Sequence, residues 1–122
     1  MYGDKFMNNL LSTLSISALL AAPLASAFTL TQVTCRVFSP NVPDPAVNRV
    51  RFHFSNPDSG EVTIRIFDLG GALIRRNLDL ESAGVMYWNG KDQGGAFVKG
   101  GVYLYQLEAS NKVLTGTVVV AK

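Results

Sequence analysis

Residues with reactive side chains are scarce in this sequence of 122 residues, which has one cysteine, Cys35, and one histidine, His53. A single cysteine excludes an intramolecular disulfide, and two interpretations of it remain: a small buried residue, or a thiol that pairs with another molecule. His53 has no serine or cysteine motif beside it, so the sequence supports no catalytic triad. Paired carboxylates at catalytic-looking positions and a phosphate-binding glycine loop are also missing. We therefore expect no enzyme activity and no cofactor.

The sequence also has little excess of positive over negative charge. Lys and Arg number 11 and Asp and Glu number 9, which gives a net charge of +2. The basic residues form no long run, so the charge pattern argues against a nucleic acid partner. The length suits a single domain, and no internal repeat or linker is present.

The first residues of the chain match the three regions of a signal peptide. Lys5 supplies a positive charge, and residues 10–24 (LLSTLSISALLAAPL) form an uncharged apolar stretch. Residues 25–27 (ASA) have the small side chains that a signal peptidase accepts. The pattern predicts cleavage after Ala27, with 1–27 as signal peptide and 28–122 as the folded domain. It also predicts a secreted, extracellular or cell-surface protein.

The competing interpretation is that this segment is kept as a membrane helix. No charge occurs between Lys5 and Arg36, a stretch long enough to span a bilayer. Six Asn, Ser and Thr side chains dilute it between residues 8 and 17, whereas a spanning helix needs about 20 mainly apolar residues. Contact with a membrane is expected only through this segment, and only if it is not cleaved.

The remainder of the chain has the pattern of short strands separated by turn signals, with no helical period. Alternation is clearest in residues 47–54 and in residues 61–68. Further strands are expected at 33–38, 72–80, 85–89, 102–109 and 113–121. The predicted fold class is therefore all-β: a seven-stranded antiparallel immunoglobulin-like β-sandwich, preceded by a hydrophobic N-terminal signal or helical segment.

Several segments also resemble the motifs of a known family, in the family's order. They are residues 38–41 (FSPN), 60–68 (GEVTIRIFD), 69–75 (LGGALIR), 88–95 (WNGKDQGG), 100–107 (GGVYLYQL) and 116–122 (GTVVVAK). Together they resemble the FlgD-like immunoglobulin domain, named after the flagellar hook-capping protein, and the C-terminal sorting domains of type IX secretion. Asn89 stands where the family usually has Asp, and Gly100 where it often has Ser. The resemblance implies an interaction or sorting module without catalysis.

Arginines are the first group of candidate partner contacts. Alternation puts Arg49, Arg51 and Arg65 on polar strand faces, and these could share one outer face with Arg75 and Arg76. One interpretation is a solvated face that discourages edge pairing. The other is a contact patch for an acidic partner or a surface glycan.

Aromatic residues are the second group. Tyr103 and Tyr105 share one face of a strand, and they belong either to the core or to a binding surface. Trp88 is expected to pack between the sheets. The glycine-rich loop after it offers one carboxylate, Asp92, which is too few for calcium. We expect this loop to be a turn capped by side-chain hydrogen bonds.

The function predicted from these features is that of an exported interaction or assembly module. Its partner would be another protein or further copies of the same chain. The alternative is a structural subunit of an extracellular filament or appendage. In that case residues 28–38 (FTLTQVTCRVF) would pair with the sheet edge of a neighbouring subunit.

Overall fold

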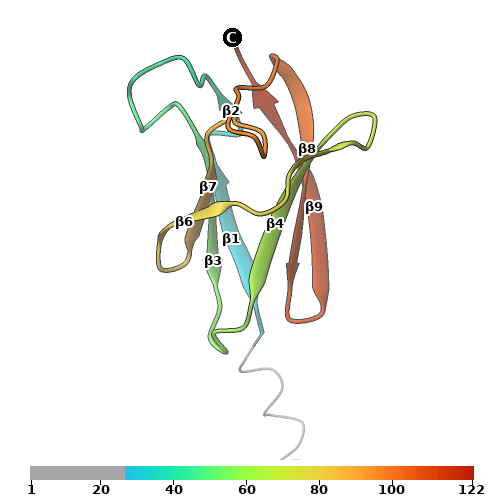
Figure 1. The fold of residues 1–122 in the computed structure, drawn as a ribbon. Coiled ribbons are helices and arrows are strands. Elements are labelled where there is room, and N and C mark those ends of the chain that lie inside the picture. The colour runs from blue at the N-terminus through green and yellow to red at the C-terminus, as the bar shows by residue number, and fades with distance from the viewer. Residues whose placement is uncertain (1–26) are drawn as a thin grey trace, which may run out of the picture.

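The computed structural model describes residues 27–122, and these form nine β-strands (Figure 1). The all-β class is therefore confirmed. No helix in the described range is long and apolar enough to cross a membrane. The signal peptide expected at residues 1–27, and its alternative as a retained helix, lie outside the described residues except for Ala27.

The strands form two sheets that face each other. The four-stranded sheet has the order β1-β3-β7-β6, with β1 at Thr29–Thr34, β3 at Val50–Ser55, β7 at Val85–Trp88 and β6 at Asp79–Ser82. The five-stranded sheet has the order β2-β9-β8-β4-β5, with β2 at Val37–Phe38, β9 at Lys112–Val120, β8 at Gly101–Ala109, β4 at Val62–Asp68 and β5 at Leu73–Arg75.

Nine strands replace the expected seven because two of the expected strands each contain a change from one sheet to the other. Cys35 has a φ of 57°, a left-handed conformation that breaks the first expected strand. The chain leaves β1 of the four-stranded sheet there and continues as β2 of the five-stranded sheet. Residues 76–78 carry the chain from β5 of the five-stranded sheet back to β6 of the four-stranded sheet. The single strands expected at 33–38 and 72–80 are therefore wrong.

The pairing is antiparallel throughout the described residues except between β2 and β9, which run parallel. Val37 and Phe38 lie opposite Val119 and Val120 in this pair. The prediction of a purely antiparallel fold is wrong at this pair because β2 reaches β9 through a change of sheet and not through a hairpin.

The core lies between the two sheets and is built from inward-facing residues of both. Trp88 of β7 is fully buried, and its ring makes edge-to-face contacts with Phe38 of β2 and Tyr103 of β8, at centroid distances of 5.7 and 5.4 Å. Its indole Nε1 donates a hydrogen bond to the carbonyl of Lys91 at 2.8 Å. The expected role of Trp88 between the sheets is therefore confirmed.

Candidate interaction surfaces

Two of the predicted arginine contacts lie on the outer face of the four-stranded sheet. Arg51 Nε donates to both carboxylate oxygens of Glu81, at 3.0 and 2.9 Å, and Arg51 Nη2 donates to the carbonyl of Pro45 at 2.9 Å. The guanidinium of Arg49 lies 4.7 Å from the ring centre of Tyr87 and 3.9 Å from Glu81. Both arginines are thus engaged by groups of their own chain.

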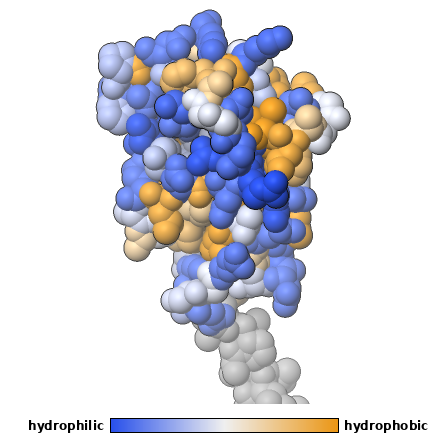
Figure 2. All heavy atoms as spheres, in the orientation of Figure 1, coloured by the Kyte–Doolittle hydropathy of each residue, from blue (hydrophilic) through white to orange (hydrophobic). Residues whose placement is uncertain are grey.

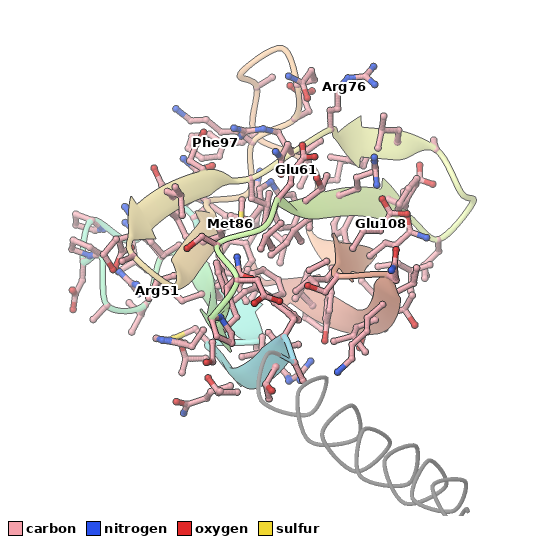
Figure 3. All side chains as sticks on the ribbon, turned by 90° about the horizontal axis from the view of Figure 1, so that it is seen from below. Arg51, Glu61, Arg76, Met86, Phe97 and Glu108 are labelled. Carbon is pink, nitrogen blue, oxygen red and sulfur yellow. The ribbon has the colours of Figure 1, made fainter. Side chains whose placement is uncertain are left out.

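Arg65 lies on the other sheet, so the arginines do not share one face. Its Nη1 is 2.6 Å from Glu108 Oε1 on the outer face of the five-stranded sheet. Figure 3 shows Arg51 and Glu108 on opposite sides of the molecule. Arg75 pairs with Asp79 at 3.1 Å, and Arg76 lies away from both arginine sites (Figure 3). The expected common face is wrong because alternation predicts the side of a strand and not the sheet that the strand joins.

Replacement of Arg51 tests whether its contacts stabilise the fold. We expect Arg51→Ala to lower the free energy of unfolding by about 1 kcal/mol in urea denaturation, because a half-exposed ion pair and a carbonyl contact are lost. Arg76→Ala is the matched control, since its side chain is exposed and has no ion pair within residues 27–122. We expect that change to stay within about 0.5 kcal/mol. Equal losses in the two variants would contradict the assigned role of Arg51.

Tyr103 and Tyr105 both belong to the core. They are only 7% and 4% exposed, because alternation along β8 turns them inward. The Tyr103 hydroxyl donates to the carbonyl of Lys99 at 2.7 Å, and burial, with a smaller contribution from the charge of Asp68, raises the pKa of Tyr103. The Tyr105 ring packs edge-to-face on Phe52 at 4.9 Å. Of the two interpretations of this pair, the structure supports the core.

The residues with reactive side chains are dispersed. His53 Nε2 lies 3.3 Å from the hydroxyl of Thr34 on the outer face of the four-stranded sheet. Cys35 is half-buried, and its thiol donates to the carbonyl of Ala46 at 3.2 Å. Within residues 27–122, no group of three or more His, Cys, Asp or Glu side chains is placed to hold a metal ion.

The loop after Trp88 is held by its own side chains, as expected. Asp92 Oδ1 accepts hydrogen bonds from the amides of Gly94 and Ala96, both at 3.0 Å. Gln93 Oε1 accepts the amide of Arg76 at 2.7 Å and so joins this loop to the segment after β5. The predicted turn capped by side chains is confirmed.

An apolar row that the sequence analysis did not identify crosses the outer face of the five-stranded sheet. Its members are Val37 of β2, Val119 of β9, Val102 and Leu104 of β8, Phe67 of β4 and Leu73 of β5. Val102 and Leu104 face outward because the alternate residues of β8, Tyr103 and Tyr105, face the core. The other members share this face through their register with β8 and with its neighbours. Val37, Val102 and Leu73 are the most exposed, at 62%, 40% and 43%. Hydrophobic residues also gather on the flank of the molecule formed by β8 and the β4–β5 hairpin (Figure 2).

A signal for this row was present in the sequence. Residues 102–105 (VYLY) are apolar at every position, so the strand has an apolar outer face as well as an apolar inner face. Elsewhere, as in β3, apolar and polar residues alternate and only one face is apolar. Loss of alternation in a strand that is covered on one side only is therefore the mark of an exposed apolar face.

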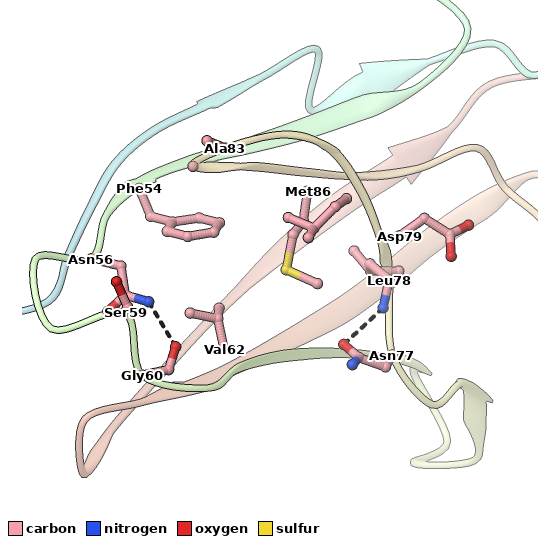
Figure 4. Close-up of a pocket in the computed structure, with 12 residues that line it drawn as sticks. Phe54, Asn56, Ser59, Gly60, Val62, Asn77, Leu78, Asp79, Ala83 and Met86 are labelled. Carbon is pink, nitrogen blue, oxygen red and sulfur yellow. Dashed lines mark hydrogen bonds between the residues drawn. The ribbon is translucent and has the colours of Figure 1, made fainter.

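A cavity of about 670 Å³ opens between the sheets, near the turn that joins β3 to β4 (Figure 4). Phe54, Val62 and Met86 are among the apolar residues that line it. Two polar groups at its rim have partners within the domain: Asn56 Nδ2 donates to the carbonyl of Gly60 at 2.7 Å, and Asn77 Oδ1 accepts the amides of Ile64 and Leu78 at 3.1 and 3.0 Å. The volume of the cavity suits a small molecule. The side-chain oxygen of Asn77 and the side-chain amide of Asn56 already bond within the domain, so a ligand would have to compete for them.

Comparison with known proteins assigns this chain to no family. No family model matches it, and no curated protein matches it. Two features of the five-stranded sheet face solvent: its outer face, and the edge of β9 that β2 leaves uncovered.

Proposed function

We propose that residues 28–122 form an immunoglobulin-like interaction module that binds a protein partner through the outer face of its five-stranded sheet. The observation that carries this proposal is the apolar row, which crosses all five strands of that sheet. Large contiguous apolar patches are rare on monomeric proteins and mark interaction sites. The Arg65–Glu108 pair and the exposed Thr115 and Thr117 lie beside the row, so it has the apolar centre and polar rim of a protein interface.

The strand order supports the immunoglobulin-like part of the proposal. The order β1-β3-β7-β6 corresponds to the ABED sheet of immunoglobulin domains, and β9-β8-β4 corresponds to the GFC sheet. The buried tryptophan lies on β7, the equivalent of strand E, whereas antibody domains carry theirs on strand C. The proposed likeness to immunoglobulin domains therefore rests on the strand order and not on the position of the tryptophan.

Export is part of the same proposal. Phe28, the residue that follows the predicted cleavage site, is fully buried and packs against Phe54 at a centroid distance of 5.6 Å. Cleavage after Ala27 would therefore leave every described core residue in the mature chain. We propose a secreted or cell-surface module that engages its partner outside the cell, with sorting as one form of such engagement.

Site-specific photocrosslinking in the producing cells tests the proposed face. A photoreactive amino acid at Val102 or Leu73 is expected to yield a discrete adduct with another protein. The same group at Ser82, which is exposed on the four-stranded sheet, is the control and should yield none. Excess unlabelled protein should compete for the adduct. Adducts of equal yield at all three positions, or at none, would count against this face.

Self-assembly is the second candidate function, and one observation favours it. Residues 29–34 and 37–38 are already paired with β3 and β9 of their own chain, so strand donation by residues 28–38 would require β1 and β2 to detach. The edge of β9, in contrast, is open along most of its length within the described residues. An assembly through strand pairing would therefore use β9.

A further inference from the structure

The sheet edges of this domain differ in how well they are protected. Irregular pairing interrupts β1 between Leu30 and Gln32 and interrupts β6 between Leu80 and Ser82. The strand β5 has three residues and an irregular register with β4, and β2 has two residues. Bulges and short length are the usual devices that prevent an edge from pairing with another chain.

The strand β9 lacks these devices. It pairs with β8 through nine successive residue pairs without a register shift. On its other side β2 covers only Val119 and Val120, so residues 112–118 have no strand neighbour there within residues 27–122. Lys112 is the only charged residue of β9, and the strand contains no proline. It is thus the longest regular open edge among the described residues.

The direction of its unpaired backbone groups follows from the bonds at its end. The amides of Val119 and Ala121 donate to the carbonyls of Arg36 and Phe38, at 2.7 and 2.8 Å. Alternate residues of a strand direct their amides and carbonyls to the same side. The backbone groups of residues 113, 115 and 117 therefore point away from β8, toward the open edge of the sheet. One of these groups, the carbonyl of Thr117, accepts a long bond of 3.3 Å from Arg36 Nη1.

We propose that this edge pairs with the same edge of a second copy, so that two β9 strands run antiparallel about Thr115. The inference rests on the proposed function as an interaction module, but it uses the sheet edge and not the apolar row. The pairing would join the two five-stranded sheets into one continuous sheet. A two-fold contact of this kind is closed, so it yields a dimer and not a filament.

The sequence of β9 is complementary to itself in this register. Val113 lies opposite Thr117 of the second copy, and the two Thr115 side chains lie opposite each other, so β-branched residues pair on the outer face. On the inner face Leu114 lies opposite Gly116, which sets a large residue against a small one. The two Lys112 side chains lie at opposite ends of the contact, so like charges are not opposed.

The size of the contact predicts its strength. Stable interfaces bury about 1,200–2,000 Å², and a seven-residue edge with its flanking side chains is smaller than that. We therefore expect a weak dimer whose population rises with protein concentration. The open Thr117 carbonyl is held only by Arg36, an exposed side chain that can give way to the incoming strand.

Two variants that introduce opposite charges at Thr115 test the register directly. Sedimentation of the exported protein over concentrations on the order of 1 µM to 1 mM should show a monomer–dimer equilibrium. Thr115→Lys and Thr115→Glu each place like charges at the two-fold axis, so each variant alone should remain monomeric. An equimolar mixture of the two should dimerise again, because the opposed charges now attract. Thr63→Lys is the matched control, since Thr63 lies on the same face but on the inner strand β4, and it should dimerise as the original does.

The outcomes separate this inference from the proposed function. A protein that stays monomeric at the highest concentration, or a dimer that both single charge variants retain, would overturn the β9 pairing. Loss of the dimer in both variants without its return in the mixture would overturn the register about Thr115. None of these results alters the photocrosslinking from Val102, which reports on the outer face.

Discussion

Trp88→Ala is expected to lower the free energy of unfolding by about 3–5 kcal/mol. The indole ring is fully buried and joins the sheets, because it lies on β7 and contacts Phe38 and Tyr103 of the five-stranded sheet. Its removal leaves a cavity at that contact and an unpaired carbonyl at Lys91. The total stability of a small domain is about 5–15 kcal/mol, so this single change removes a large share of it.

The measurement requires a control that separates burial from residue type. Leu80→Ala is suitable, because Leu80 lies on the adjacent strand β6 but is 66% exposed. We expect that variant to lose less than about 1 kcal/mol. Trp88 is the only tryptophan, so unfolding must be followed by circular dichroism and not by tryptophan fluorescence. Similar losses in the two variants would contradict the role of Trp88 between the sheets.

Gly116→Ala is expected to destabilise the domain by about 1–3 kcal/mol through overpacking. A Cβ atom at this position would lie 2.5 Å from the Tyr105 ring, because that ring covers Gly116 on the inner face of the sheet. The ring is held against Phe52 at 4.9 Å, so it has little room to move aside. Gly60→Ala is the matched control, since nothing lies within 4 Å of a Cβ atom there. Its effect in urea denaturation should stay within about 0.5 kcal/mol.

A double-mutant cycle shows whether the Tyr105 ring causes this loss. In a Tyr105→Leu background the ring is absent, so Gly116→Ala should cost less than it does alone. An unchanged cost in that background would mean that the contact with Tyr105 is not the cause.

Local features of the fold were predictable from the sequence because they depend on period-two alternation. The alternation of β3 and β4 put Val50, Phe52 and Phe54 on one face and Val62, Ile64 and Ile66 on one face. Four of these six residues are fully buried, and Phe54 and Val62 are half-buried against the core. The changes of sheet at Cys35 and at residues 76–78 were not predictable, because they depend on pairing between strands that are distant in the sequence. Side chains alternate between two faces before and after such a crossing, so alternation does not mark the residue at which the chain changes sheet.

The same limit explains the candidate contact residues. Alternation placed Arg51 and Arg65 on outer faces, but it did not show that β3 and β4 belong to different sheets. The pairing of Arg51 with Glu81 also joins residues that are 30 positions apart, which no local pattern predicts. The apolar row depends on register across five strands, so only its part on β8 was visible in the sequence.

A separation-of-function variant, Leu104→Arg, tests the proposed binding face most directly. Leu104 is half-buried on the outer face and belongs to the apolar row, so a charge there should disrupt an apolar contact while the core stays intact. We predict that this variant unfolds within about 1 kcal/mol of the original protein and that its Val102 photoadduct is lost. A folded Leu104→Arg protein that retains the Val102 adduct at full yield would contradict the proposal that this face binds the partner.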